Sequence, residues 1–88
     1  MVAEKTKDDL LRRLRKVKGQ ISGLERMIEK DASCSNILIQ VSAVRAAIGK
    51  IGMLIMQNYM RDCFSCQDEK SFNERVEELV NSFSKFIR

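Results

Sequence analysis

The chain of 88 residues is long enough for a single small domain, which we expect to span residues 1–88. It is 44% hydrophobic and 32% charged and has no proline or tryptophan, a composition typical of a soluble helical protein rather than a disordered one. The net charge of +4 permits nucleic acid or an acidic membrane as a partner. The sequence contains no histidine, so the commonest general base and the commonest metal ligand are both missing.

The first predicted element is a helix over about residues 6–30, because apolar residues recur there at steps of four and three. Thr6 and Asp9 form a weak capping box at its start. The residues before it are charged and include no apolar signal segment, which predicts a cytoplasmic protein. The apolar positions of this helix are Leu10, Leu14, Val17, Ile21, Leu24 and Ile28.

A second helix is predicted over about residues 35–64, with Ser33 or Ser35 as its N-cap. No unbroken apolar run approaches the ~18 residues of a membrane span, so we expect no membrane partner. A third helix is predicted over about residues 71–87, opened by a capping box of Ser71 and Glu74. No pattern typical of a strand is present, and the fold class is all-α. The apolar positions of the second helix are Ile37, Val41, Val44, Ile48, Ile51 and Ile55.

Three helices joined by short loops leave only a thin core in one chain. The broad apolar face of the second helix therefore requires helices from another chain. We expect a homodimer in which the first and second helices of two copies form an antiparallel four-helix bundle.

Five cations occur among the seven residues 12–18. On a helical wheel, Arg12, Arg15 and Lys16 lie opposite the apolar face, whereas Arg13 and Lys18 flank it. Such a cluster is either a solvated helix face or a surface that contacts phosphate. The sequence has no helix-turn-helix layout, so DNA would bind to a basic surface of an oligomer.

Cys34 and Cys63 stand at the two ends of the second predicted helix. A continuous helix separates them by ~43 Å, whereas a disulfide needs Cα atoms within ~7 Å. They can meet if two copies of the helix lie antiparallel, head to tail. Backbone N–H groups at the helix start favour a thiolate at Cys34, which makes it the better nucleophile and Cys63 the resolving partner.

Cys63 and Cys66 form a C-x-x-C pair. This pair supplies two of the four ligands of a zinc site, and no histidine can complete the set. A thioredoxin-like site would require a βαβ setting, which the sequence lacks. Another interpretation is that all three cysteines are small, mostly buried hydrophobic residues.

Three segments resemble the CsoR/RcnR family of bacterial metal- and thiol-sensing transcriptional repressors: RRLRKVKGQISGLERMIEKDASC at 12–34, QVSAVRAAIGK at 40–50 and NYMRDC at 58–63. The resemblance covers nearly the whole chain. It implies antiparallel helical dimers, a flat tetramer built from two dimers, and a repressor that holds operator DNA until its cysteines are modified or metallated. The DNA-contacting cations of the family map onto the basic stretch, most directly onto Arg13, and Lys50 matches a basic position of the second helix.

The resemblance also bears on the effector. Copper-sensing members share cysteines matching Cys34 and Cys63 but carry a histidine where this chain has Tyr59. Nickel- and cobalt-sensing members need several histidines, and formaldehyde-sensing members generally lack the second cysteine. Two cysteines without the histidine resemble the persulfide-sensing, CstR-like branch. There the cysteine matching Cys34 becomes persulfidated and joins the cysteine matching Cys63 of another subunit as a di- or polysulfide.

The leading hypothesis is therefore a repressor that responds to persulfide donors and requires no cofactor. The second is a Cu(I)-responsive repressor that binds the metal through Cys34, Cys63 and, as a third candidate ligand, Cys66. A small thiol oxidoreductase is a hypothesis of another class, but it lacks the fold context and the histidine base. A purely structural helical adaptor would explain the apolar faces but not a basic stretch combined with a cysteine at a helix start. We expect no enzymatic activity.

Overall fold

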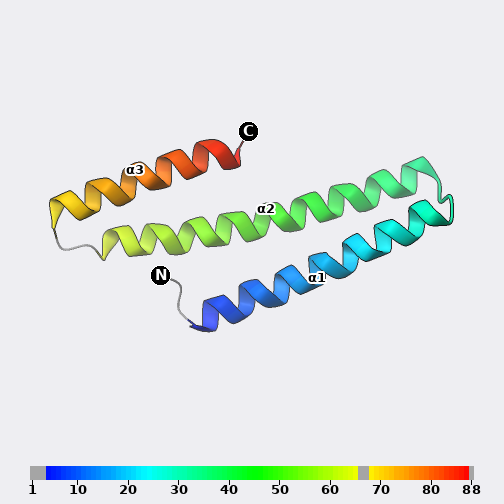
Figure 1. The fold of residues 1–88 in the computed structure, drawn as a ribbon, viewed down its shortest axis with the longest axis horizontal. Coiled ribbons are helices and arrows are strands. Elements are labelled where there is room, and N and C mark those ends of the chain that lie inside the picture. The colour runs from blue at the N-terminus through cyan, green and yellow to red at the C-terminus, as the bar shows by residue number, and fades with distance from the viewer. Residues whose placement is uncertain (1–3, 66–67, 88) are drawn as a thin grey trace. The chain divides into compact units, whose positions relative to one another are not determined.

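The computed structural model describes residues 4–65 and 68–87, apart from the side chains of Cys63 and Phe64. They form three helices: α1 (Glu4–Glu29), α2 (Cys34–Phe64) and α3 (Glu69–Phe86) (Figure 1). No strand occurs in the described part of the chain, and the all-α prediction is confirmed. The predicted helix bounds agree with the observed ones to within two residues.

The starts of two helices differ from the prediction. α1 begins at Glu4, ahead of Thr6, and the carboxylate of Asp9 accepts hydrogen bonds from Arg12 and Arg13 instead of capping the helix. α3 begins at Glu69, with Asp68 as its extended N-cap residue. The Asp68 carbonyl accepts the N–H of Phe72 at 3.1 Å and thereby starts the helix before Ser71 is reached. The capping boxes predicted at Thr6 and Ser71 are therefore wrong.

The turn between α1 and α2 is stabilised at both ends by backbone and cap hydrogen bonds. The Ala32 N–H donates to the Met27 carbonyl at 2.9 Å and the Asp31 N–H to the Ile28 carbonyl at 3.2 Å, which is a Schellman motif. Asp31 has the left-handed φ of 56° that this motif requires. Two residues later, the Ser33 hydroxyl accepts the Asn36 N–H at 3.2 Å, which confirms Ser33 as the N-cap of α2.

The chain divides into two compact units, and α2 takes part in both. The first unit, Glu4–Ile51, contains α1 and the first part of α2, which run antiparallel (Figure 1). The second unit includes Gly52–Arg88 and contains the last part of α2 and α3. Among the described residues three hydrophobic side chains are buried, and all belong to the first unit: Leu10, Val17 and Ile51. A single domain over residues 1–88 stays a prediction.

The apolar positions of α1 and α2 divide into two sets, each with a seven-residue repeat. One set is buried or half-buried in this chain: Leu10, Val17 and Leu24 in α1, and Ile37, Val44 and Ile51 in α2. The other set is exposed: Leu14, Ile21 and Ile28 in α1, and Val41, Ile48 and Ile55 in α2, with exposed fractions of 42–60%. Each helix therefore has one apolar row covered within the chain and a second row left uncovered.

In the second unit, α3 and the last part of α2 form an apolar groove of about 260 Å³. Gly52 allows a close approach in this unit, because a Cβ atom there would lie 2.5 Å from Cζ of Phe86. No described residue of the unit reaches full burial. The groove is lined by Met53, Met56, Gln57, Met60, Leu79, Val80, Phe83 and Ser84.

By length and composition alone, the Cys34–Asp62 part of α2 could cross a membrane. This differs from the sequence prediction, which considered only unbroken apolar runs. Arg45 and Lys50 lie near the middle of the helix, where each charge would cost about 2.5–3.5 kcal/mol in a bilayer. The apolar core helix of a soluble assembly passes the same test of length and composition.

Candidate functional site

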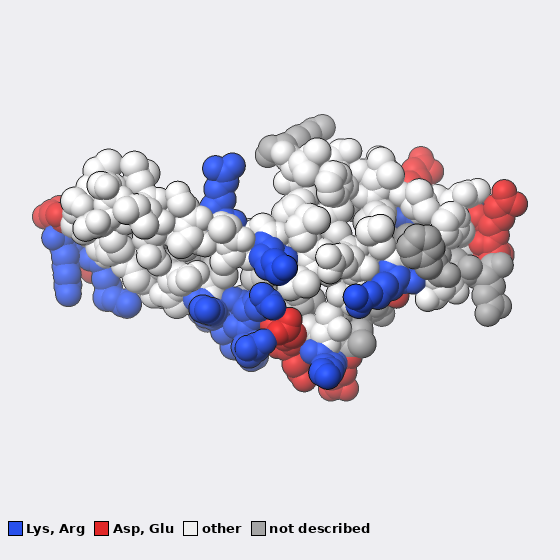
Figure 2. Space-filling view, turned by 180° about the vertical axis from the view of Figure 1, so that it is seen from behind, with Lys and Arg blue, Asp and Glu red and all other residues white. Residues whose placement is uncertain are grey.

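A hollow of about 160 Å³ lies between α1 and α2 in the first unit. Three cations from two helices line it: Arg13 and Lys16 of α1, and Lys50 of α2. Figure 2 shows Lys and Arg side chains gathered in this part of the surface. Three positive charges around one depression attract an anion of matching size, such as a phosphate group. The remaining lining residues are Val17, Gln20, Ala47 and Ile51.

Among the residues that line this hollow, Gln20 is polar but uncharged. Its Oε1 atom is buried and has no hydrogen-bond partner among the described residues. Val17 and Ile51, which also line the hollow, are both buried and apolar. The hollow thus combines buried apolar atoms and one unpaired amide oxygen with three cationic side chains.

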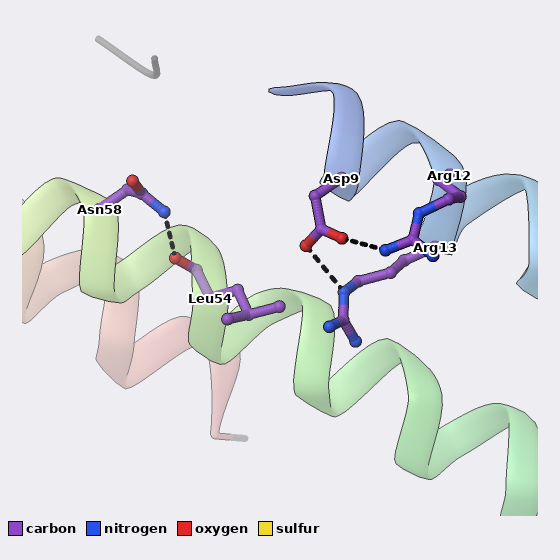
Figure 3. Close-up of polar contacts among 5 residues, drawn as sticks. All are labelled: Asp9, Arg12, Arg13, Leu54 and Asn58. Carbon is purple, nitrogen blue, oxygen red and sulfur yellow. Dashed lines mark hydrogen bonds and ion pairs between the residues drawn. The ribbon is translucent and has the colours of Figure 1, made fainter. Parts of the chain in front are cut away.

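Asp9 holds two of the cations of α1 (Figure 3). Its two carboxylate oxygens accept one hydrogen bond each, from Nη2 of Arg12 and from Nε of Arg13, the latter at 3.0 Å. Both pairs have the i, i+3 or i, i+4 spacing of neighbours on a helix surface. These hydrogen bonds hold the pKa of Asp9 below its ordinary value, and the bond from Arg12 has a larger effect than the bond from Arg13.

The structure gathers three of the six predicted DNA-binding cations around the hollow and leaves the other three elsewhere. Arg12, Arg15 and Lys18 are exposed on α1 and do not line the hollow. Lys16 remains exposed but lines the hollow, so it does not point fully away from the packed side as the helical wheel predicted. Sequence reasoning missed the role of Asp9, although its spacing to Arg12 and Arg13 could have indicated the bonds.

Cys34 is the first residue of α2, which confirms its predicted place at the start of that helix, and its side chain is exposed rather than buried. It follows the Ser33 cap directly, so the local backbone around it is fixed by the hydrogen bonds of the turn. Cys63 lies in the last turn of the same helix, and a helix of that length keeps the two cysteines of one chain apart. The side chain of Cys63 and all of Cys66 lie outside the described residues.

The described residues hold no group of three or more Cys, Asp or Glu side chains that could bind a metal ion. The donor type nevertheless fits Cu(I), because soft thiolates are its preferred ligands. Cys34 supplies a single thiol at one end of α2. A Cu(I) site would therefore need further thiolates, which would have to come from Cys63 and Cys66 of a second copy of the chain.

Comparisons with known proteins decide the class of protein. Residues 6–85 match the family described as metal-sensitive transcriptional repressors. The chain belongs to this family, the CsoR/RcnR repressors. It is accordingly a transcriptional repressor rather than an enzyme, as predicted.

Curated relatives support this assignment at the level of sequence. The copper-sensing transcriptional repressor CsoR of Bacillus subtilis is 31% identical over 87 residues, which is 98% of this chain and 86% of that protein. The copper-sensing transcriptional repressor RicR of Mycobacterium tuberculosis is 39% identical over 57 residues, or 65% of this chain and 59% of that protein. Both relatives are described as copper sensors.

Solved structures support it at the level of the fold. The Cu(I)-bound copper-sensing repressor CsoR from Geobacillus thermodenitrificans superposes with a TM-score of 0.91 at 25% identity, over 100% of this chain and 93% of that one. The nickel-responsive regulator InrS superposes with a TM-score of 0.79 at 30% identity, over 90% of both chains. The family is thereby confirmed, while the persulfide-sensing branch is not confirmed by these relatives.

Proposed function

We propose that this CsoR/RcnR family member is a homo-oligomeric repressor of the bacterial cytoplasm that binds operator DNA through a basic face and releases it when its cysteines react with persulfides. The observation that carries the DNA-binding part is the hollow ringed by Arg13, Lys16 and Lys50. A cationic depression built from two helices can seat a backbone phosphate without a recognition helix. The basic face comprises Arg12, Arg13, Arg15, Lys16, Lys18 and Lys50.

The exposed apolar rows of α1 and α2 support an antiparallel dimer. Leu14, Ile21 and Ile28 on α1, with Val41 and Ile48 on α2, repeat every seven residues and stay 42–60% exposed in one chain. A second pair of helices would cover both rows and complete a four-helix bundle. A lipid environment would instead bury Arg45 and Lys50 at great cost. A tetramer of two such dimers agrees with the exposed groove of the second unit.

The switch would join two chains through sulfur. The Cys34 thiolate attacks the outer sulfur of a persulfide RS–SH, which gives a Cys34 persulfide and releases RS⁻. The Cys63 thiolate of a second copy then attacks the Cys34 sulfur, which gives a disulfide and releases hydrosulfide. The donor is thereby the oxidant, and no other is needed. The exposure of Cys34 at the start of α2 supports its role as the first nucleophile.

Release of DNA follows because the link ties together the ends of two antiparallel α2 helices. Lys50 lies on α2, and Arg13 and Lys16 lie on α1, so a shift between helices changes the spacing of the cations around the hollow. A hundredfold loss of DNA affinity corresponds to ~2.7 kcal/mol of coupling between the cysteine and DNA sites.

Cu(I) is a second candidate effector, and the relatives favour it, since CsoR and RicR are described as copper-sensing. Cys34 of one copy with Cys63 and Cys66 of another would supply three thiolates of the kind that Cu(I) prefers. The two effectors differ in their need for Cys66. The persulfide route uses only two cysteines, whereas a three-thiolate copper site uses all three.

The DNA part is tested by measuring salt-dependent binding of a duplex that the wild-type protein selects from a random-sequence pool. Lys50→Gln is expected to weaken binding and to reduce the slope of log affinity against log salt by about one unit, as for one lost phosphate contact. The matched control is Lys30→Gln, which removes an equal charge from the exposed turn after α1, outside the hollow. Equal effects of the two substitutions would contradict a phosphate site at the hollow.

The effector part is tested by exposing the DNA-bound protein to glutathione persulfide and, separately, to Cu(I). We expect glutathione persulfide to release the DNA and to produce a covalent dimer that reductant removes. Cys34→Ala is expected to bind DNA and to keep it, whereas Cys66→Ala responds as the wild type. A protein that ignores the persulfide but leaves DNA on binding Cu(I), with Cys66→Ala impaired, would replace the sulfur hypothesis by the copper one.

A further inference from the structure

Asp9 is a carboxylate that contacts two cations of the proposed DNA-binding face, Arg12 and Arg13. A negative charge beside Arg12 and Arg13 repels phosphate, so its presence needs a reason. The geometry of the Arg13 bond supplies one. Asp9 contacts Arg13 at Nε, the inner nitrogen of the guanidinium group, at 3.0 Å. Figure 3 shows the two terminal nitrogens of Arg13 on the side of the group that faces away from the carboxylate.

Within the described part of the chain, this arrangement leaves four N–H groups of Arg13 without a hydrogen-bond partner, because a guanidinium carries five donors and Asp9 takes one. Those four belong to the terminal nitrogens, which form the fork that binds phosphate through two parallel hydrogen bonds. Arg13 also lines the hollow together with Lys16 and Lys50. Its side chain is 39% exposed, compared with 76% for Arg12, so Arg13 is the more enclosed of the two cations that Asp9 holds.

We infer that Asp9 is a positioning residue, which fixes the Arg13 guanidinium so that its terminal nitrogens bind a DNA phosphate at the hollow together with Lys16 and Lys50. A free arginine loses rotamer freedom when it binds phosphate, and an arginine that is already held loses less. Fixing one long side chain beforehand is worth about two- to tenfold in affinity. This inference rests on the proposed DNA-binding function and adds to it a residue of the opposite charge.

Asp8 provides a matched control for Asp9. Both are acidic residues in the same part of α1, and in the described part of the chain no hydrogen bond or ion pair involves Asp8. Removal of either carboxylate relieves the same kind of repulsion from DNA. Removal of Asp9 alone also frees Arg13.

The test is a double-mutant cycle on affinity for the duplex selected from the random pool, with circular dichroism as the check on folding. We expect Asp8→Ala to leave binding unchanged or to strengthen it by about twofold, because only charge repulsion is lost. We expect Asp9→Ala to bind about two- to tenfold more weakly than Asp8→Ala. In the Arg13→Ala background this difference is expected to shrink, because only the bond from Arg12 to Asp9 is left to lose.

The result that overturns the inference is Asp9→Ala having the same effect with and without Arg13, in whichever direction. Asp9 would then not act through Arg13. If Arg13→Ala alone leaves affinity unchanged, both the inference and the assignment of Arg13 to the basic face are refuted. If Arg13→Ala weakens binding but the Asp9 effect does not depend on it, the basic face stands and only the positioning role is refuted.

Discussion

The two compact units of the chain differ in how their apolar side chains are covered. The unit Glu4–Ile51 contains all three buried hydrophobic residues and a turn whose two ends are capped by hydrogen bonds. The unit that includes Gly52–Arg88 has no fully buried residue among those described, and its methionine, leucine and phenylalanine side chains line an open groove. The first unit therefore buries part of its apolar surface within one chain. The apolar surface of the second unit depends more on another chain to cover it.

The largest expected effect comes from truncating the core of the first unit. Ile51 is 5% exposed, so Ile51→Ala should lower the free energy of unfolding by about 2–4 kcal/mol in urea titrations at fixed protein concentration. Ile48, one turn away and 42% exposed, is the comparison. Ile48→Ala should mainly weaken association, so its cost should grow as the protein is diluted. An Ile51→Ala variant that loses less than ~1 kcal/mol would place the core elsewhere.

Two glycines of α2 allow the packing of the two units to be compared, because Gly49 belongs to the first unit and Gly52 to the second. A Cβ at Gly52 would lie 2.4 Å from Cε1 of Phe86, so Gly52→Ala should displace that ring and destabilise the α2–α3 packing by about 1–3 kcal/mol. A Cβ at Gly49 would meet nothing within 4 Å, so Gly49→Ala should stabilise the helix by up to about 1 kcal/mol.

Thermal unfolding monitored by circular dichroism distinguishes these two variants. The double variant Gly52→Ala/Phe86→Ala serves as the control, because it removes the atoms that clash. Equal stabilities for Gly49→Ala and Gly52→Ala would contradict the close packing of Phe86 on α2.

A smaller gain is expected at the turn of the first unit. Asp31 has a φ of 56°, a conformation that glycine adopts without strain. Asp31→Gly should raise the free energy of unfolding by about 0.5–1 kcal/mol in chemical denaturation, because the Schellman motif is kept and the strain of the side chain is removed. A loss of stability would show that the Asp31 side chain makes a compensating contact.

The smallest effect concerns pH. Hydrogen bonds from Arg12 and Arg13 lower the pKa of Asp9, so the ionised carboxylate is favoured in the folded state. A group with a lowered folded-state pKa contributes stability above its unfolded value and loses that contribution as the pH falls through its folded value. The stability difference between wild type and Asp9→Asn should therefore be present at neutral pH, begin to fall near the unfolded-state pKa of about 4, and vanish only below the lowered pKa of the folded state.

Carboxyl NMR titration of Asp9 measures this directly, with its midpoint expected below the ordinary value of an aspartate. A midpoint at the ordinary value would argue against the bonds to Arg12 and Arg13. Because Asp9 lies at the surface, added salt should move its midpoint toward the ordinary value.

Helix periodicity was sufficient to predict the fold class and all three helices, because a repeat of four and three residues depends only on local geometry. Periodicity could not show which apolar residues are covered within the chain. Leu10 and Leu14 are successive positions in the same four-and-three pattern, yet Leu10 is 9% exposed and Leu14 is 42% exposed. That division depends on the position of a neighbouring helix. The cap at Asp68 was missed for a similar reason, since several polar residues near it could start a helix equally well.

The candidate site was predictable in part. The cations of α1 and the place of Cys34 follow from local sequence, and Lys50 entered through the family resemblance. The hollow itself, which brings Lys50 beside Arg13 and Lys16, is a tertiary feature that spacing along one helix cannot reveal. The unpaired Oε1 of Gln20 and the direction of the Arg13 fork likewise depend on three-dimensional contacts.

In the proposed switch, Cys34 in the first unit of one copy is joined to Cys63 in the second unit of another. Complementation between two single variants is the sharpest test of this link. Cys34→Ala and Cys63→Ala proteins, each alone, should form no covalent dimer with glutathione persulfide. After mixing and subunit exchange, the antiparallel heterodimer retains one Cys34 beside one Cys63. Mass spectrometry under non-reducing conditions should then detect a cross-linked dimer that contains one chain of each variant. A mixture without that species, or a covalent dimer from either variant alone, would contradict the claim.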